Sequence, residues 1–267
     1  MKTYAEHYQK CRQSYLEEKD DSIYTSAYDV SLDTDLLELD DEYYEAIAEI
    51  SKKTSKMFET GEGCFEDDHA IRLNDWNSID ELEWLADIVV PQIEEKVFHS
   101  YVKVEFVHPY RNKIVERDPA TSWLWHYDDC PKEFLKLFIH LNEVSDKNGC
   151  IQYISDSEGK VPVLESSRIN PWQRGQQVYE SSRIPNNVVD DLVRSGGKIN
   201  NLTGKQGSYA LFTPNVMHRA TVPKKGTDPR DAIVLFVRPS LKEQVNYIQG
   251  TAYSYLPERN VKQYSLN

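Results

Sequence analysis

The composition of the chain describes one large globular domain with a strong negative charge. The chain has 267 residues, 39% of them hydrophobic, and its 44 acidic and 31 basic residues give a net charge of −13. That length is enough for one core of good size. The acidic balance argues against nucleic acids and anionic membranes as partners, because both would repel the chain.

The cysteines and the apolar segments predict a cytoplasmic protein. The four cysteines stand at positions 11, 64, 130 and 150 without a CxxC pair, which is typical of reduced cysteines rather than of a disulfide framework. The first residues, MKTYAEHYQK, contain no apolar core of a signal peptide. The longest apolar stretch, around positions 84–90, is too short to span a bilayer.

Helical periodicity dominates the first hundred residues. Apolar positions recur at three- and four-residue spacing from position 43 to 57, and Asp40 is placed to cap the start. Ser78 and Glu81 have the spacing of a capping box before a second apolar run. Pro91 should kink that helix or restart it. We expect a loop at 61–68, between the two helices.

From about residue 101 the pattern becomes that of β-strands. Short runs rich in β-branched or aromatic residues lie at about 101–107, 135–141, 150–154, 208–212 and 232–237. A polar stretch at 155–203 interrupts them and holds one short predicted helix at 187–194. Short strands around a long insertion favour a jelly roll over a parallel α/β sheet. The predicted fold class is therefore mainly β with flanking helices (α+β).

This pattern predicts a single domain, 1–267. It comprises a helical N-terminal region at 1–100, a jelly-roll core at 101–240 with an insertion at 156–205, and a C-terminal extension at 241–267.

One pair of residues in the segment WLWHYDDC (123–130) suits a metal site. Of the seven histidines, only His126 has an acid two positions later, Asp128. Residues i and i+2 of a strand point to the same face, so both side chains can face one cavity, whereas Asp129 points away. In an acidic chain such a pair also arises by chance, so a third ligand is needed.

His218 supplies a candidate third ligand. It closes a predicted strand in the segment LFTPNVMHRAT, about ninety residues after Asp128. Two histidines and one carboxylate leave three coordination positions open, which suits Fe(II) chemistry with a chelating keto acid and dioxygen. A strand-end histidine bonded only to the backbone is the alternative interpretation.

Arg230 opens the next predicted strand and could receive the second carboxylate of such a keto acid in a bidentate contact. The connector at 222–229 is too long for a tight hairpin, so it suits a crossing to the facing sheet that would direct His218 and Arg230 into one cavity. Arg238 has the same strand parity and is the rival. Lys136 could assist a carboxylate in the cavity, although strand lysines usually face water.

Six further residues have roles that the sequence leaves open: Trp123 and Trp125 in the motif, Arg111 and Arg117 before it, and Trp172 and Arg174 in the insertion. The first two could be core, lid or substrate wall. The two arginines before the motif could receive an anionic substrate or pair with nearby acids. The insertion is a place where lids and substrate loops commonly lie.

The order of these motifs resembles the phytanoyl-CoA dioxygenase-like family of Fe(II)/2-oxoglutarate-dependent oxygenases. The likeness covers roughly residues 100–240, and it includes the strand LKLFIHL at 135–141, a turn with Asn-Gly and the strand after it. The resemblance implies a double-stranded β-helix, with His126, Asp128 and His218 as catalytic metal ligands for Fe(II). It also implies that Arg230 binds 2-oxoglutarate, the co-substrate used with O2.

Two departures from the family pattern separate the chain from its better-known members. Ala232 stands where the family often has Ser or Thr, and SDSEG at 155–159 replaces a frequent Pro-Gly-Ser-His run. The resemblance therefore applies to the superfamily and does not support phytanoyl-CoA as a substrate.

The expected function is oxidation, by hydroxylation or a related reaction, of a small-molecule metabolite such as an amino acid derivative, with release of succinate and CO2. The sequence does not predict an oligomeric state. Two alternatives stay open: a cupin-like metal-dependent hydrolase or isomerase, and a non-catalytic jelly-roll binding module. The first alternative has no use for Arg230, and metal analysis would test the second.

Overall fold

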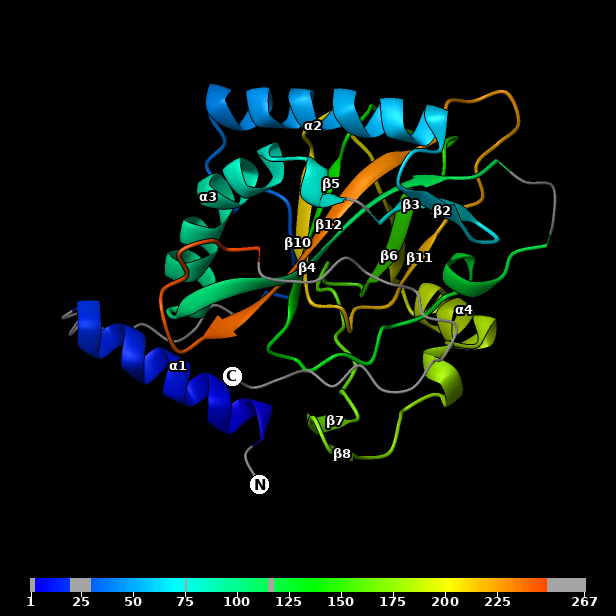
Figure 1. Ribbon diagram of the computed structural model, residues 1–267. Coiled ribbons are helices and arrows are strands. Elements are labelled where there is room, and N and C mark those ends of the chain that lie inside the picture. The colour runs from blue at the N-terminus through cyan, green and yellow to red at the C-terminus, as the bar shows by residue number, and fades with distance from the viewer. Residues whose placement is uncertain (1–2, 20–29, 75, 115–117, 249–267) are drawn as a thin grey trace.

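The computed structural model describes residues 3–19, 30–74, 76–114 and 118–248, and two antiparallel sheets face each other at its centre (Figure 1). The large sheet has the strand order β1-β10-β5-β12-β4-β3-β2, and the small sheet has the order β11-β6-β9. A separate hairpin, β7-β8, lies outside both sheets. Four α-helices flank this arrangement among the described residues, which confirms the predicted class.

The elements have the following bounds. The helices are α1 (Tyr4–Lys19), α2 (Asp41–Thr60), α3 (Glu81–Ile93) and α4 (Asn186–Arg194), with short helical turns at Trp76–Ser78, Glu94–Phe98, Thr121–Trp123 and Glu180–Ser182. The strands are β1 (Leu32–Asp33), β2 (Cys64–Glu66), β3 (Ala70–Leu73), β4 (Tyr101–Asn112), β5 (Leu135–His140), β6 (Ile151–Ser155), β7 (Arg168–Asn170), β8 (Gln173–Arg174), β9 (Lys198–Leu202), β10 (Tyr209–Phe212), β11 (His218–Ala220) and β12 (Asp231–Ser240).

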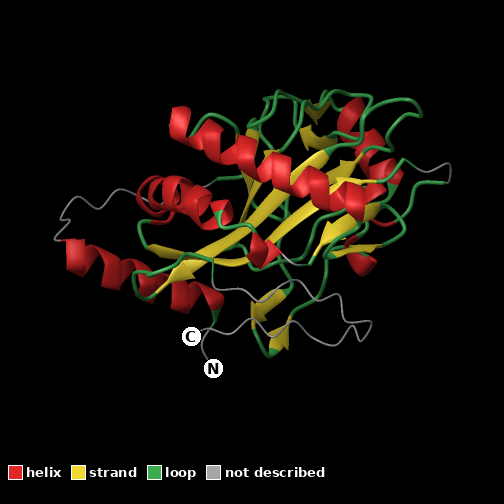
Figure 2. Ribbon diagram, turned by 45° about the horizontal axis from the view of Figure 1, so that its top comes forward, coloured by secondary structure: helices red, strands yellow, loops and turns green. Residues whose placement is uncertain are grey.

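Strand alternation gives the large sheet one apolar outer face and one mixed inner face. Leu137 and Ile139 of β5 pack into the core formed with α2 and α3, which cover the outer face (Figure 2). Lys136 and Phe138 of the same strand point the opposite way and line a cavity. The helices therefore stabilise the sheet from outside and leave its inner face available for a site.

The connector at 222–229 leads from β11 of the small sheet to β12 of the large sheet, as predicted. Because β12 pairs with both β4 and β5, it forms the middle of the large sheet. Residues at the start of β12 therefore enter from the centre of the fold.

The helical region contains both confirmed and wrong expectations. The Asp40 side chain caps α2 by accepting a bond from the Tyr43 N–H (3.1 Å), as predicted. The capping box is wrong, because α3 begins at Glu81, whose carboxylate instead pairs with Lys53 (2.7 Å). The α-helix continues through Pro91 to Ile93 and then changes to a π-helical turn.

Several short strands were not predicted from the sequence. Strands β2 and β3 extend the large sheet where only loop and helix were expected, and β1 pairs at its other edge. Strand β9 belongs to the predicted insertion, yet it pairs with β6 along five residues. Most of the predicted C-terminal extension lies outside the described residues. No helix among the described residues is long and apolar enough to cross a membrane.

Glu94 is a buried carboxyl group whose charge should make stability depend on pH. Its Oε1 accepts the Val102 N–H (2.7 Å), but burial dominates and raises the pKa of Glu94 to about 7. An unfolded chain ionises this group near pH 4.3, so the folded state loses stability relative to the unfolded state as pH rises from there to about 7. Glu94→Gln keeps the acceptor and should raise the unfolding free energy by about 1–3 kcal/mol at pH 8, with little change below pH 4.5.

Urea unfolding of both proteins at the two pH values measures this difference. The exposed neighbour Glu95 gives the matched control, Glu95→Gln, for which we expect no pH-dependent gain. An equal gain at both pH values would contradict the role assigned to the Glu94 charge.

Candidate active site

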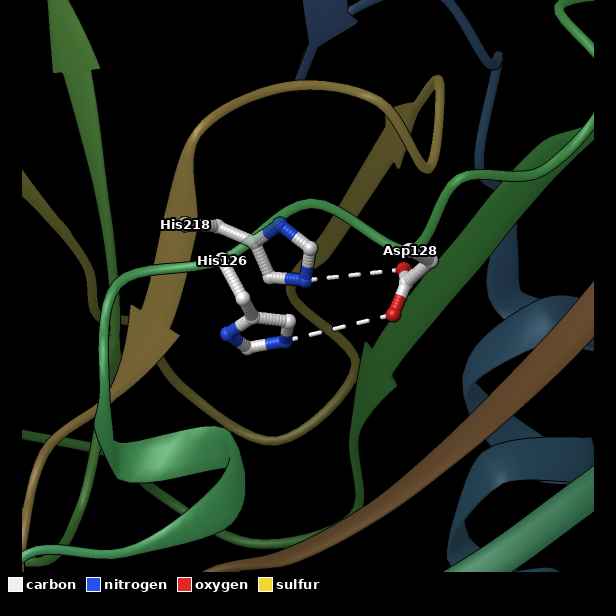
Figure 3. A group of neighbouring side chains, drawn as sticks. All are labelled: His126, Asp128 and His218. Carbon is white, nitrogen blue, oxygen red and sulfur yellow. Dashed lines mark ion pairs between the residues drawn. The ribbon is translucent and has the colours of Figure 1, made fainter. Parts of the chain in front are cut away.

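The three predicted ligands lie together, although their local structure differs from the prediction. His126 is not part of a regular strand, because it forms single β-bridges, one of them with His218. The two residues exchange backbone hydrogen bonds of 3.0 and 2.9 Å. His218 begins β11 rather than closing the preceding strand. Figure 3 shows both rings pointing toward Asp128, and the ligand atoms of all three residues lie within 4.8 Å of one another.

Backbone carbonyl groups fix the orientation of both imidazole rings. His126 Nδ1 donates to the Leu124 carbonyl (2.8 Å), and His218 Nδ1 donates to the Val216 carbonyl (2.9 Å). Because the carbonyl oxygen can only accept, each Nδ1 carries the proton and each Nε2 presents a lone pair. These lone pairs face the carboxylate of Asp128 at 3.9 and 3.7 Å.

The charge state of the group suits a cation. Burial lowers the pKa of His126 to about 3 and that of His218 to about 4, so both rings are neutral near pH 7. Burial opposes ionisation of Asp128, but Lys136 and the two histidines outweigh it and hold the pKa of Asp128 below its ordinary value. Lys136 donates to the Asp128 carboxylate. Three acceptor groups thus converge where a positive ion would satisfy them.

The group opens into a cavity of about 530 Å³ between the two sheets. Phe106, Phe212 and Phe236 contribute aromatic walls, and Phe106 stacks on Phe236 with ring centroids 4.0 Å apart. The Lys136 ammonium lies over the Phe236 ring at 5.0 Å. A small molecule bound here would lie beside the three converging ligand atoms.

Arg230 lines the same cavity, and no ion pair joins it to a described acidic residue. Its side chain is only 1% exposed, and its guanidinium lies over the rings of Tyr110 (5.4 Å) and Phe138 (5.3 Å). Nη2 donates to Tyr110 Oη and to Asn112 Oδ1, both at 3.1 Å. Nε and Nη1 are buried and have no hydrogen-bond partner in the part of the chain that the structure describes. A buried cation with two unused donors is costly unless an anion binds it.

The two residues that accept hydrogen bonds from Arg230 were not predicted from the sequence. Tyr110 and Asn112 follow His108 in alternation on β4, so three polar side chains share the inner face of a strand. Asn112 Nδ2 also donates to the Gly149 carbonyl (3.3 Å). Gly149 has φ 88°, and a Cβ there would lie 2.8 Å from Asn112 Nδ2, so this position requires glycine. The Asn-Gly turn therefore positions Asn112, which in turn accepts a hydrogen bond from Arg230.

The other residues named from the sequence lie in varied surroundings. Arg238 is buried and pairs with Glu105 (2.6 Å), away from the cavity lining. Arg111 donates two bonds of 2.7 Å to Asp231. The motif tryptophans, Trp123 and Trp125, are buried, whereas Trp172 and Arg174 are exposed. Arg117 lies outside the described residues.

Asp129 points away from the three ligands, as predicted, and fastens the insertion. It has φ 49° and is 2% exposed. Its carboxylate accepts bonds from the Ser167 N–H (2.7 Å) and hydroxyl (2.5 Å), and from Gln177 Nε2 (2.9 Å). Arg168 Nε donates to its carbonyl (2.5 Å). Asp128 therefore faces the two histidines, whereas the adjacent Asp129 binds residues of the insertion.

Removal of the Asp129 carboxylate should loosen the insertion. Asp129→Ala leaves several buried donors unpaired, each at a cost of about 1–3 kcal/mol. We expect faster amide hydrogen exchange across residues 166–177 while the core strands stay protected. The exposed Asp190 of α4 provides the control, Asp190→Ala. Unchanged exchange in the Asp129 variant would show that other contacts hold this segment.

Solved structures of two other proteins have folds similar to that of this chain. No family model matches the chain, and no curated protein matches it, so the resemblance to the phytanoyl-CoA dioxygenase-like family stays a prediction. The chain is similar to SnoN, a non-haem α-ketoglutarate-dependent epimerase from nogalamycin biosynthesis, with a TM-score of 0.54 and 11% identity over 97% of this chain and 92% of SnoN. It is also similar to EctD from S. alaskensis, with a TM-score of 0.52 and 14% identity over 82% of this chain and 76% of EctD.

Both relatives have also been solved with bound groups, EctD with Fe and SnoN with Fe3+, α-ketoglutarate and nogalamycin RO. At these identities the likeness establishes the fold alone. The two facing sheets form the double-stranded β-helix, or jelly roll, that the sequence predicts.

Proposed function

We propose that the chain is an Fe(II)- and 2-oxoglutarate-dependent oxygenase that oxidises a small-molecule metabolite. One observation carries this proposal: the buried Arg230, with two unused donors, shares a cavity with the three converging acceptors of His126, Asp128 and His218. A dicarboxylic keto acid bound to a metal would pair with both groups. The three acceptors would coordinate the metal, and the guanidinium would bind the far carboxylate of the keto acid. The shared fold with SnoN and EctD supports the same assignment.

The residues have separate roles in this proposal. Fe(II) with 2-oxoglutarate and O2 supplies the oxidation of an unreactive C–H bond, with release of succinate and CO2. His126 and His218 offer Nε2 lone pairs held in place by their Nδ1 bonds, and Asp128 offers a charged oxygen. Lys136 keeps that carboxylate ionised, and its ammonium is placed to assist binding of a co-substrate carboxylate.

Hydroxylation is the outcome we expect. Desaturation, ring closure or demethylation would use the same residues and would differ in how the cavity places the substrate. The aromatic walls hold a small molecule beside the ligand group and exclude water from it.

The first test needs no knowledge of the substrate. Anaerobic addition of 2-oxoglutarate to the Fe(II)-loaded protein should produce the visible charge-transfer absorption of a keto acid chelated to iron. A screen of metabolite pools with Fe(II), ascorbate and O2 should then find substrate-dependent succinate release. A protein that binds Fe(II) but never develops this absorption would contradict the proposal.

A metal-dependent hydrolase or isomerase is the second candidate for the same three ligands. The surroundings of Arg230 disfavour it, because such an enzyme would leave a buried guanidinium without a partner. Stoichiometric zinc in freshly purified protein, together with no binding of 2-oxoglutarate, would favour this alternative.

A further inference from the structure

The insertion places an arginine directly opposite the histidine motif. Arg183 forms a β-bridge with His126, and His126 forms another with His218, so the three residues occupy one row of a short antiparallel ladder. Arg183 and His126 form a non-hydrogen-bonded pair, because the backbone hydrogen bonds (2.9 and 3.2 Å) join the residues on either side of them. In such a pair the two Cα atoms lie close together. Directly opposed residues of such a ladder project to the same face. Arg183 therefore points to the side on which the imidazoles lie, and it lines the cavity.

The Arg183 guanidinium has no partner within the described part of the chain. No hydrogen bond or ion pair joins it to any other described side chain, although the residue is partly buried. A guanidinium that has lost part of its water without gaining an acceptor is prepared to bind an anion.

The other basic side chains of the cavity already have partners or a task. Arg72 contacts Asp67 (2.5 Å), His108 (2.6 Å) and His69 (3.1 Å) through its three nitrogen atoms. The remaining three basic side chains are Lys136, which donates to Asp128, Arg168, which donates to the Asp129 carbonyl, and Arg230, which is assigned to the co-substrate.

The cavity therefore has a charge opposite to that of the whole protein. Among the described residues, five Arg or Lys side chains line it, and Asp128 is the one carboxylate. The chain as a whole carries a net charge of −13. Because charge of one sign in a cleft raises the local concentration of ions of the other sign, this cavity selects anions from solution.

The backbone before Arg183 is held in a strained conformation. Ser181 (φ 56°) and Ser182 (φ 57°) are consecutive non-glycine residues with left-handed geometry, and both line the cavity. Non-glycine residues rarely adopt this geometry, so the surrounding structure must enforce it. The Tyr127 N–H bond to the Ser182 carbonyl (3.2 Å) ties this turn to the histidine motif.

We propose that Arg183 is a specificity-determining residue that binds an oxyanion, a carboxylate or a phosphate, on the primary substrate. This inference rests on the proposed function, and it makes the substrate class a small organic anion. Arg111 was a candidate for such a role from its position in the sequence, but its guanidinium pairs with Asp231. An anionic group bound to Arg183 would lie next to His126 and His218, because the three residues occupy one row of the ladder.

Modification by phenylglyoxal, mapped by mass spectrometry, tests the proposal without turnover. The protein is loaded with Ni(II) and 2-oxoglutarate, and the rate of modification at Arg183 is measured in sodium chloride, acetate or inorganic phosphate at equal ionic strength. Arg183 should react in chloride, and one of the two oxyanions should slow that reaction about fivefold or more. The more protective ion identifies a carboxylate or a phosphate as the preferred group.

The insertion also supplies the matched control. Arg174 is exposed and lies outside the cavity lining, so its modification rate should not distinguish the oxyanions from chloride. Arg183→Gln should keep the fold, Fe(II) binding and the affinity for 2-oxoglutarate, and Arg174→Gln should do the same.

Three results would overturn the inference. They are an Arg183 that does not react in chloride, equal rates in chloride and both oxyanions, and a loss of 2-oxoglutarate affinity in Arg183→Gln. The last result would assign Arg183 to the co-substrate. If 2-oxoglutarate fails to bind the unmodified protein, the proposed function fails, whereas protection of Arg183 by an oxyanion remains measurable.

Discussion

Replacement of His126 or His218 by alanine is expected to abolish stoichiometric Fe(II) binding. Each change removes one of the three proposed ligands found among the described residues and leaves Asp128 facing a single imidazole. The fold should survive, because the larger core lies on the outer face of the large sheet with α2 and α3, away from both side chains. Anaerobic titration with Fe(II), followed by metal analysis after gel filtration, measures the stoichiometry.

His108 provides the control for this experiment. It also lines the cavity, but it contacts Arg72 and is not one of the three converging ligands. His108→Ala should therefore retain one Fe(II) per chain, and circular dichroism should report folded protein for all three variants. Retention of one tightly bound iron in both the His126 and the His218 variant would remove the basis of the proposed metal centre.

Arg230→Ala is expected to weaken binding of 2-oxoglutarate about ten- to hundredfold, because a lost charge-assisted contact costs about 1.5–3 kcal/mol. The same change should not destabilise the protein without co-substrate, since it removes a buried charge that has two unpaired donors. The unmodified protein should gain about 2.7 kcal/mol of stability at a hundredfold excess of 2-oxoglutarate over its Kd, and the variant should lose most of this gain.

Arg238→Ala should behave in the opposite way. It breaks the pair with Glu105 and should lower stability, yet it should leave the affinity for 2-oxoglutarate unchanged. Anaerobic titrations of Fe(II)-loaded protein and thermal unfolding with and without 2-oxoglutarate separate the two effects. A loss of affinity in the Arg238 variant alone would mean that the co-substrate uses the other arginine.

The grouping of the candidate site could be predicted from residue types, their spacing and chain order. His126 and Asp128 do lie together, although their segment forms single β-bridges instead of the regular strand on which the prediction was based, and the long connector before Arg230 indicated a crossing between sheets. The roles of Tyr110 and Asn112 could not be predicted, because they depend on which strand lies beside the start of β12. The same holds for Arg183, which lies opposite His126 through a pairing between residues 57 positions apart in the chain.

The fold was predictable where local preference and burial agree, and not elsewhere. The 232–237 run is apolar and rich in β-branched residues, the 135–141 run consists mainly of Leu, Phe and Ile, and both form strands in the middle of the large sheet. Strand β9 has the sequence KINNL, in which asparagine disfavours a strand, so its pairing with β6 must determine its conformation. The three-residue strand β2 carries too few positions for any periodicity to be detected.

The bonds to Asp129 also determine how the insertion can vary in length. Ser167 and Gln177 stand on either side of the β7-β8 hairpin, which projects from the body of the protein in Figure 1, and both donate to this one carboxylate. The two ends of the hairpin are thus held together at its base by the Asp129 carboxylate. Because doubling the length of a closed loop costs only about 0.6 kcal/mol, hairpins of other lengths can be grafted between these two residues at small cost. Residues 169–176 are therefore the exchangeable part of this segment, whereas Arg168, which donates to the Asp129 carbonyl and lines the cavity, has to be kept.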